Sequence, residues 1–214
     1  MSIPSPRPFL EKNPIVPVVV LNRVEDAVPT ANALLAGGIT SAEVTFRTPV
    51  AAQCIAQIAQ NVPDITVGAG TVINAEQANA AIDAGAQFLV SPGFSTDVAQ
   101  VASDRNISLL PGVANPTDIM AALEWGIDVV KFFPAVALGG LPLVKAFAAP
   151  FPQLKFLPTG GISHKNAAEW LAQPFIAAVG GSWMVSPSLV EAGDFAAITE
   201  LSQQAMSIAQ EATR

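Results

Sequence analysis

The sequence predicts an α/β protein folded as one closed (β/α)8 barrel, because of three features of the chain. Short apolar runs alternate with Ala-rich amphipathic segments from residue 15 onward, and such runs are typical of parallel strands covered on both faces. The runs recur about every 20–25 residues, as parallel βαβ units do. No linker, low-complexity stretch or charge block divides the 214 residues. The count of eight runs favours a TIM barrel over an open doubly wound sheet.

The expected elements follow one another along the chain. Strands are predicted at residues 15–20, 42–46, 66–70, 88–91, 109–113, 129–133, 156–159 and 177–180. Helices are predicted at 27–36, 75–84 and 117–125, each ending just before a glycine, with a last amphipathic helix at 194–210. Pro49, Pro116 and Pro142 fit first-turn helix positions. A single domain is expected over residues 1–214, with residues 1–14 as an N-terminal extension whose short helix closes the barrel floor.

Composition and charge exclude several classes of function. Half of the residues (51%) are hydrophobic and 13% are charged, which provides a core and argues against disorder. The formal charge of −7 and the pI near 4.5 argue against nucleic acid and anionic membranes as partners. The single cysteine, Cys54, excludes internal disulfides and is expected to be a small core residue. The N-terminus has no apolar signal core and no run approaches a transmembrane span, so a cytoplasmic protein is expected.

Lys131 interrupts an apolar run that otherwise predicts a buried strand. An ammonium group in such a strand costs several kcal/mol of desolvation unless it is paired or neutral. Burial favours the neutral amine, which is a nucleophile toward carbonyl carbon. The alternatives are a lysine that extends out of the strand end and one that pairs with a buried acid. Lys131 is therefore the candidate nucleophile.

Glu43, Thr45 and Arg47 share one face of the second predicted strand, because side chains alternate along a strand. If the residues between them pack against helices, Glu43 points into the barrel and Arg47 lies at its mouth. A carboxylate inside the barrel needs a partner, and Lys131 is the obvious candidate. A purely structural Glu43–Lys131 ion pair remains the alternative.

Polar and glycine residues end three further strands, at the barrel face where active sites lie. Thr71 closes Gly68-Ala69-Gly70-Thr71 and supplies a hydroxyl, although Gly–Thr is also an ordinary helix-start signal. Gly160-Gly161 and Gly180-Gly181-Ser182 follow the last two strands. Each pair was expected to open a helix whose backbone N–H groups hold a phosphate. Tight turns required only for packing are the alternative.

No metal site or nucleotide fingerprint is predicted. His164 is the only histidine, and no cysteine cluster accompanies it. The segment that begins at Gly68 lacks the third glycine of a dinucleotide-binding loop. We therefore expect neither a cofactor nor a metal.

The chain resembles bacterial 2-keto-3-deoxy-6-phosphogluconate (KDPG) aldolase, also called 4-hydroxy-2-oxoglutarate aldolase, a family of class I lyases. The resemblance extends from about residue 15 to the C-terminus. It is carried by Ile15-Val16-Pro17-Val18, Ala36-Gly37-Gly38, Glu43-Val44-Thr45-Phe46-Arg47-Thr48, Val67-Gly68-Ala69-Gly70-Thr71-Val72, Ser91-Pro92-Gly93, Leu110-Pro111-Gly112, Val130-Lys131-Phe132-Phe133-Pro134-Ala135, Pro158-Thr159-Gly160-Gly161-Ile162 and Gly180-Gly181-Ser182-Trp183.

The resemblance implies a role for each matched residue. Lys131 would form the Schiff base and Glu43 would be the general acid/base. Arg47 and Thr71 would bind the keto-acid carboxylate, and Thr159 would bear on aldol stereochemistry. The remaining substrate-binding positions implied are Pro92, Phe133, Gly160, Gly161, Gly180, Gly181 and Ser182, with the Gly-Gly turns and Ser182 at the phosphate end.

The implied partners are small molecules, namely a 2-keto-3-deoxy sugar acid phosphate and pyruvate, with a homotrimer and a place in the Entner–Doudoroff pathway. One departure is visible, because Asn22-Arg23 stands where the family has more basic sequence. This departure puts the distal phosphate contacts there in doubt. The rivals are the phosphogalactonate aldolase, a sugar-phosphate isomerase or epimerase barrel, and a non-catalytic phosphate-binding barrel. Thr159 favours the gluconate type, since the galactonate family tends to have an apolar residue there.

Overall fold

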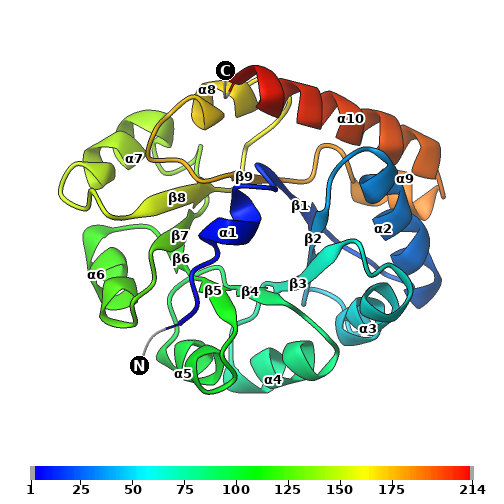
Figure 1. Cartoon of the computed structure of the whole chain (residues 1–214), viewed down its shortest axis with the longest axis horizontal. Helices are drawn as coiled ribbons and strands as arrows, with labels where there is room; N and C mark the ends of the chain where they lie inside the picture. Colours follow the sequence, from blue (N-terminus) through cyan, green and yellow to red (C-terminus); the bar gives the residue numbers. More distant parts are fainter. Residues whose placement is uncertain (1–2, 213–214) are drawn as a thin grey trace.

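A ring of parallel strands surrounded by helices forms the molecule, as Figure 1 shows for the computed structural model, which describes residues 3–212. The strands are β1 (Ile15–Val19), β2 (Ser41–Thr45), β3 (Thr66–Gly70), β4 (Phe88–Val90), β5 (Ser108–Leu110), β6 (Gly112–Val113), β7 (Val129–Phe132), β8 (Lys155–Pro158) and β9 (Val179–Gly181).

The strand pairing closes into a barrel. The strand order is β5-β4-β3-β2-β1-β9 in one sheet and β6-β7-β8 in the other, and the neighbouring strands are parallel. Bridges from Phe156 to Ile176 and from Thr159 to Gly180 join β8 to the β9 segment. Since β5 and β6 are consecutive pieces of one barrel position, the barrel has eight positions. The predicted (β/α)8 fold is confirmed.

The fifth predicted strand, 109–113, is not continuous. It divides into β5 and β6 at Pro111. Proline has no backbone N–H to donate to a ladder, and this explains the break. The Pro111 carbonyl still accepts a hydrogen bond of 2.9 Å from the Lys131 N–H, so the chain stays attached to β7.

Helices cover the outside of the barrel. They are α1 (Arg7–Leu10), the 3-10 helix η1 (Val24–Asp26), α2 (Ala27–Ala36), α3 (Ala51–Asn61), α4 (Ala75–Asp83), α5 (Thr96–Asp104), α6 (Pro116–Glu124), α7 (Gly140–Ala148), α8 (Ala167–Leu171), α9 (Pro187–Glu191) and α10 (Phe195–Ala212). Among residues 3–212, no helix combines the length and apolarity needed to cross a membrane.

Capping residues explain where several helices begin. The side chains of Asn74, Ser95 and Asn115 accept hydrogen bonds from backbone N–H groups in the first turns of α4, α5 and α6. Pro116 is in the first turn of α6, as expected. The first-turn position predicted for Pro49 is wrong, because α3 begins only at Ala51. The intervening turn is held by the Thr48 hydroxyl, which donates to the Leu21 carbonyl at 2.7 Å.

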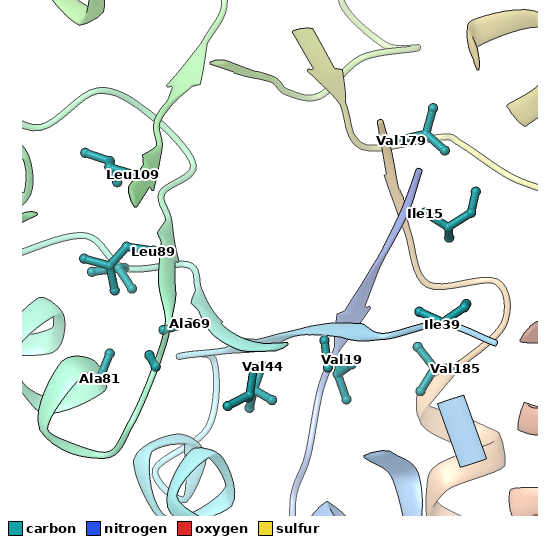
Figure 2. Close-up of a cluster of buried hydrophobic side chains, with 14 of the residues drawn as sticks. Ile15, Val19, Ile39, Val44, Ala69, Ala81, Leu89, Leu109, Val179 and Val185 are labelled. Atoms are coloured by element: carbon teal, nitrogen blue, oxygen red, sulfur yellow. The ribbon is translucent and has the colours of Figure 1, made fainter. Parts of the chain in front are cut away.

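Apolar side chains fill two separate layers. The larger layer lies between the strands and the helices, and Figure 2 shows Val44, Ala69 and Leu89 from three neighbouring strands in it. The smaller layer lies inside the barrel and consists of Leu10, Val16, Phe88, Val90, Leu110, Val129, Leu157 and Ala178. Burial of these apolar surfaces is the main source of stability.

Helix α1 lies across the end of the barrel where the strands begin (Figure 1). Its Leu10 belongs to the inner apolar layer, and Phe9 packs against that layer. The Phe9 ring stacks on the ring of Phe88, with centroids 4.8 Å apart. The centre of the barrel floor is therefore filled by apolar side chains.

Cys54 is a buried core residue on α3, as predicted. Its Sγ lies 3.7 Å from the Arg23 carbonyl. Burial, with a smaller contribution from the carboxylates of Asp26 and Glu25, raises the pKa of the Cys54 thiol from an ordinary 9.0 to about 11. The native protein should therefore resist an aromatic disulfide reagent at about pH 8 and react only after unfolding.

The same pKa shift has a defined effect on stability. The pKa of Cys54 is higher in the folded protein, so the protonated thiol contributes to the free energy of unfolding. This contribution is complete below the unfolded pKa of 9.0 and is lost as pH rises toward the folded value of about 11. The melting temperature should fall more steeply over this interval for the native sequence than for Cys54→Ala. Rapid labelling of the native thiol, or identical pH profiles, would contradict this expectation.

Candidate active site

Lys131 and Glu43 meet inside the barrel. Lys131 is the third residue of β7 and Glu43 the third of β2, so both strands have the register that turns these side chains inward. The Lys131 Nζ lies 3.2 Å from the Glu43 Oε1. The exposed fractions are 4% for Lys131 and 0% for Glu43. The structure thus brings the candidate nucleophile and the candidate acid/base together in an interior ion pair.

Two polar atoms at this site are buried without a hydrogen-bond partner: Glu43 Oε2 and Thr159 Oγ1. Buried polar atoms are normally paired, because an unpaired one loses its hydration without compensation. Both atoms are therefore available to the hydroxyl or carbonyl groups of a ligand. The ring of Phe133 lies beside the same pair, with its centroid 5.5 Å from Lys131 Nζ.

A cavity of about 260 Å³ opens at the strand ends. Its lining contains residues from five of the barrel positions and the loops that follow them. These residues are Val18, Arg47, Phe133, Thr159, Gly160, Gly161, Ile162, Gly181 and Ser182. Most of the predicted substrate-binding residues thus surround one space, and the sequence did not single out the apolar Val18 and Ile162.

Arg47 and Thr71 form one unit at the rim of this cavity. The Arg47 Nε donates a hydrogen bond of 3.2 Å to the Thr71 hydroxyl, which links the ends of β2 and β3. Within residues 3–212, no carboxylate forms an ion pair with Arg47. The remaining N–H groups of this guanidinium are suited to a carboxylate ligand, which an arginine binds through charge-assisted hydrogen bonds.

Pro92 and Gly180 do not line the cavity. Pro92 borders a separate hollow of about 220 Å³ next to Ile73 and Phe94. A Cβ placed on Gly180 would lie 2.3 Å from Thr159 Oγ1, so the missing side chain of Gly180 makes room for Thr159. The structure therefore places Gly180 behind the threonine, whereas the sequence predicted that it would contact the substrate.

The two glycine turns differ from the predicted helix starts. Helix α8 begins at Ala167, six residues after Gly161, and α9 begins at Pro187. The intervening loop folds on itself, with Asn166 Nδ2 donating to the Gly161 carbonyl at 3.0 Å. Any anion held here meets loop N–H groups and the Ser182 hydroxyl, because these short helices start too far away.

Arg23, which stands where the family has more basic sequence, is paired with Asp26. Its guanidinium donates to both carboxylate oxygens of Asp26, at 2.8 and 2.9 Å, and this hydrogen bonding raises the pKa of Arg23. Asn22 donates to Glu191 at 3.0 Å. Asp26 three residues after Arg23 was the sequence signal for this pairing.

His164 is exposed, and within residues 3–212 no group of three or more His, Cys, Asp and Glu side chains is arranged to hold a metal ion.

The fold and the site define a class of barrel enzyme in which a buried lysine beside a carboxylate acts on a carbonyl compound. Comparison with known proteins identifies one family within that class. The family described as KDPG and KHG aldolase matches residues 7–201. The chain belongs to this family.

Three relatives illustrate the similarity. The 2-dehydro-3-deoxy-phosphogluconate aldolase of Treponema pallidum is 52% identical over 199 residues, covering 93% of this chain and 95% of the relative. The KHG/KDPG aldolase of Escherichia coli K12 is 43% identical, covering 92% and 93%. The crystal structure of KDPG aldolase from Legionella pneumophila, with pyruvate captured as a covalent carbinolamine intermediate, has a TM-score of 0.90. It is 43% identical and covers 92% of this chain and 96% of that one.

Proposed function

We propose that this protein is a class I aldolase that cleaves KDPG to pyruvate and glyceraldehyde 3-phosphate. It also cleaves 4-hydroxy-2-oxoglutarate to pyruvate and glyoxylate. The observation that carries the proposal is the buried pair of Lys131 Nζ and Glu43 Oε1, 3.2 Å apart inside a barrel whose strand ends surround a cavity. The names of the relatives support the same activity. The direct test is pyruvate release from each substrate by the purified protein, followed with lactate dehydrogenase and NADH.

Lys131 begins the reaction. The amine gives its extra proton to Glu43 and attacks the C2 ketone, forming a carbinolamine. Glu43 returns this proton to the carbinolamine hydroxyl, which leaves as water. The products are a carboxylate on Glu43 and an iminium that can accept an electron pair at C2. The burial of both residues excludes competing solvent from this step.

Glu43 serves the next two proton transfers. Its carboxylate removes the proton of the C4 hydroxyl, the C3–C4 bond breaks, and the electron pair moves to the iminium to give an enamine and an aldehyde. The resulting carboxylic acid protonates C3 of the enamine and restores the iminium. Addition of water to C2 then releases pyruvate and the free Lys131 amine. The buried, unpaired Oε2 of Glu43 supports this role, because a ligand hydroxyl would satisfy it.

The other residues bind the two ends of the substrate. Arg47, fixed by Thr71, holds the carboxylate next to the ketone. The Thr159 hydroxyl faces the C4 hydroxyl and thereby favours the gluconate configuration over the galactonate one. Gly160, Gly161, Gly181 and Ser182 hold the phosphate. The Schiff-base reaction requires no metal or cofactor. The rival function, a sugar-phosphate isomerase or epimerase, would not require a lysine beside Glu43.

Two variants should separate the ends of the substrate. Ser182→Ala removes a donor from the phosphate end, so it should raise KM for KDPG by about tenfold, the effect of roughly 1.4 kcal/mol. It should leave KM for 4-hydroxy-2-oxoglutarate within about twofold, because that substrate has no phosphate. Arg47→Ala should raise KM for both substrates. Steady-state kinetics on both compounds checks this, and an equal loss of Ser182→Ala on both would contradict the placement of the phosphate.

The assembly and location of the protein are also proposed on the family resemblance. We infer a homotrimer that works in the cytoplasm, within the Entner–Doudoroff route of sugar acid breakdown. The acidic net charge of −7 supports small-molecule partners over nucleic acid.

A further inference from the structure

Strand β3 has two glycines that face the inside of the barrel. Gly68 and Gly70 alternate with Val67 and Ala69, which are buried in the outer apolar layer. A Cβ on Gly68 would lie 2.4 Å from the ring of Phe88. The three atoms nearest to a Cβ on Gly70 would instead all belong to Glu43, with Oε1 at 2.2 Å, Cγ at 2.6 Å and Cδ at 2.8 Å. The two glycines therefore make room for two different side chains.

The strand register explains why Gly70 faces the carboxylate. Glu43 pairs with Gly68, and Thr45 pairs with Gly70, in the parallel ladder of β2 and β3. The Glu43 side chain thus leans two residues along β3 toward the cavity. This same lean brings its Oε1 to 3.2 Å from Lys131 Nζ.

The backbone of β3 does not itself require a glycine at position 70. Its φ lies outside the left-handed region, in contrast with Gly160 and Gly161, whose φ angles are 95° and 81°. An alanine would fit the strand conformation, and only the space occupied by Glu43 would be lost. The requirement for glycine therefore comes from the carboxylate.

We infer that Gly70 is a positioning residue for the aldol reaction: its missing side chain is the space that lets Glu43 reach Lys131. The inference rests on the proposed function, because it acts through the acid/base role of Glu43. A methyl group at position 70 displaces the flexible end of the glutamate, since that end moves more easily than the strand. The result is a folded barrel whose carboxylate no longer reaches the amine.

The test compares Gly70→Ala with Gly68→Ala, a control on the same strand and the same face. Gly70→Ala should lower kcat for KDPG cleavage by roughly 10²-fold, the cost of misplacing a catalytic group by about 1 Å. Its KM should stay within about threefold, because Arg47 and Ser182 are untouched. Gly68→Ala collides with Phe88, which is already stacked on Phe9, so it should lower the melting temperature and leave kcat per folded molecule within about twofold.

A double-mutant cycle shows whether Gly70 acts through Glu43. In a Glu43→Gln background, Gly70→Ala should cost less than about twofold further in kcat, because the carboxylate is already lost. If Gly70→Ala alone fails to fold, the cycle uses Glu43→Asp, whose shorter side chain leaves space for the methyl group. The double variant should then fold and turn over at the rate of Glu43→Asp.

Two results would overturn the inference. One is a Gly70→Ala protein whose kcat is within twofold of the native value. The other is a full, additive loss of kcat on adding Gly70→Ala to either Glu43 variant. A native protein that releases no pyruvate from either substrate would instead refute the proposed function itself, so the two failures are distinguishable.

Discussion

Lys131→Ala is expected to lower kcat for KDPG cleavage by roughly 10⁴-fold or more, the scale of loss when a covalent nucleophile is removed. Incubation of the native protein with pyruvate and borohydride should add one reduced pyruvyl group. Peptide mass mapping should locate it on Lys131, and it should be absent from the variant. The reason is that Lys131 is 4% exposed and lies 3.2 Å from Glu43, the proposed acid/base.

Three other lysines provide the internal control for this experiment. Lys145 and Lys165 are exposed, and Lys155 donates a hydrogen bond to the Pro174 carbonyl. None of the three forms an ion pair with a carboxylate of residues 3–212. A pyruvyl group found on any of them, with Lys131 unmodified, would show that the assignment of the nucleophile is wrong.

Glu43→Gln is expected to lower turnover by roughly 10²–10⁴-fold, the usual contribution of a general acid/base. The variant should still form the pyruvate adduct, more slowly, because Lys131 remains in place. Removing one member of a buried pair also costs about 3–5 kcal/mol of stability, so its melting temperature should fall. Turnover within a few-fold of the native rate would mean that Glu43 is only the structural partner of Lys131.

A matched variant separates stability from catalysis at this pair. Lys131→Met/Glu43→Gln replaces both charges, and it should be at least as stable as Glu43→Gln because no uncompensated charge is left in the barrel. It should have no detectable turnover and no pyruvate adduct. Thermal melts and the borohydride experiment on the same samples check both statements.

Much of the fold was predictable because its signals are local. Each barrel strand is a short apolar run that both faces bury, and β3 has the predicted bounds of residues 66–70. The division of the fifth strand was harder to predict, because Pro111 lies in an apolar run. Its effect depends on whether a neighbouring strand would accept a hydrogen bond from the backbone N–H that proline lacks. Pro49 looks like a helix-start residue, but α3 begins later because the Thr48 hydroxyl is held by the Leu21 carbonyl, which follows β1.

The candidate site was predictable only in part. The alternation of side chains along β2 and the isolated charge of Lys131 were enough to pair Glu43 with Lys131. The roles of the strand glycines were not, because Gly180 and Gly70 make room for side chains that come from other strands. Such a role depends on distances across the barrel, and spacing along the chain does not encode them directly.

The packed barrel floor separates the lysine from the centre of the barrel end where the strands begin. Leu10 and the stacked rings of Phe9 and Phe88 close the end beneath the lysine. In the proposed reaction, pyruvate carbons stay bonded to Lys131 while the aldehyde lies nearer the mouth. The aldehyde must therefore depart before pyruvate, and in the reverse direction pyruvate must enter first. The covalent bond to Lys131 thus sets the order in which the products leave, while the short N-terminal helix fills the barrel end opposite the cavity without touching any of the reacting atoms.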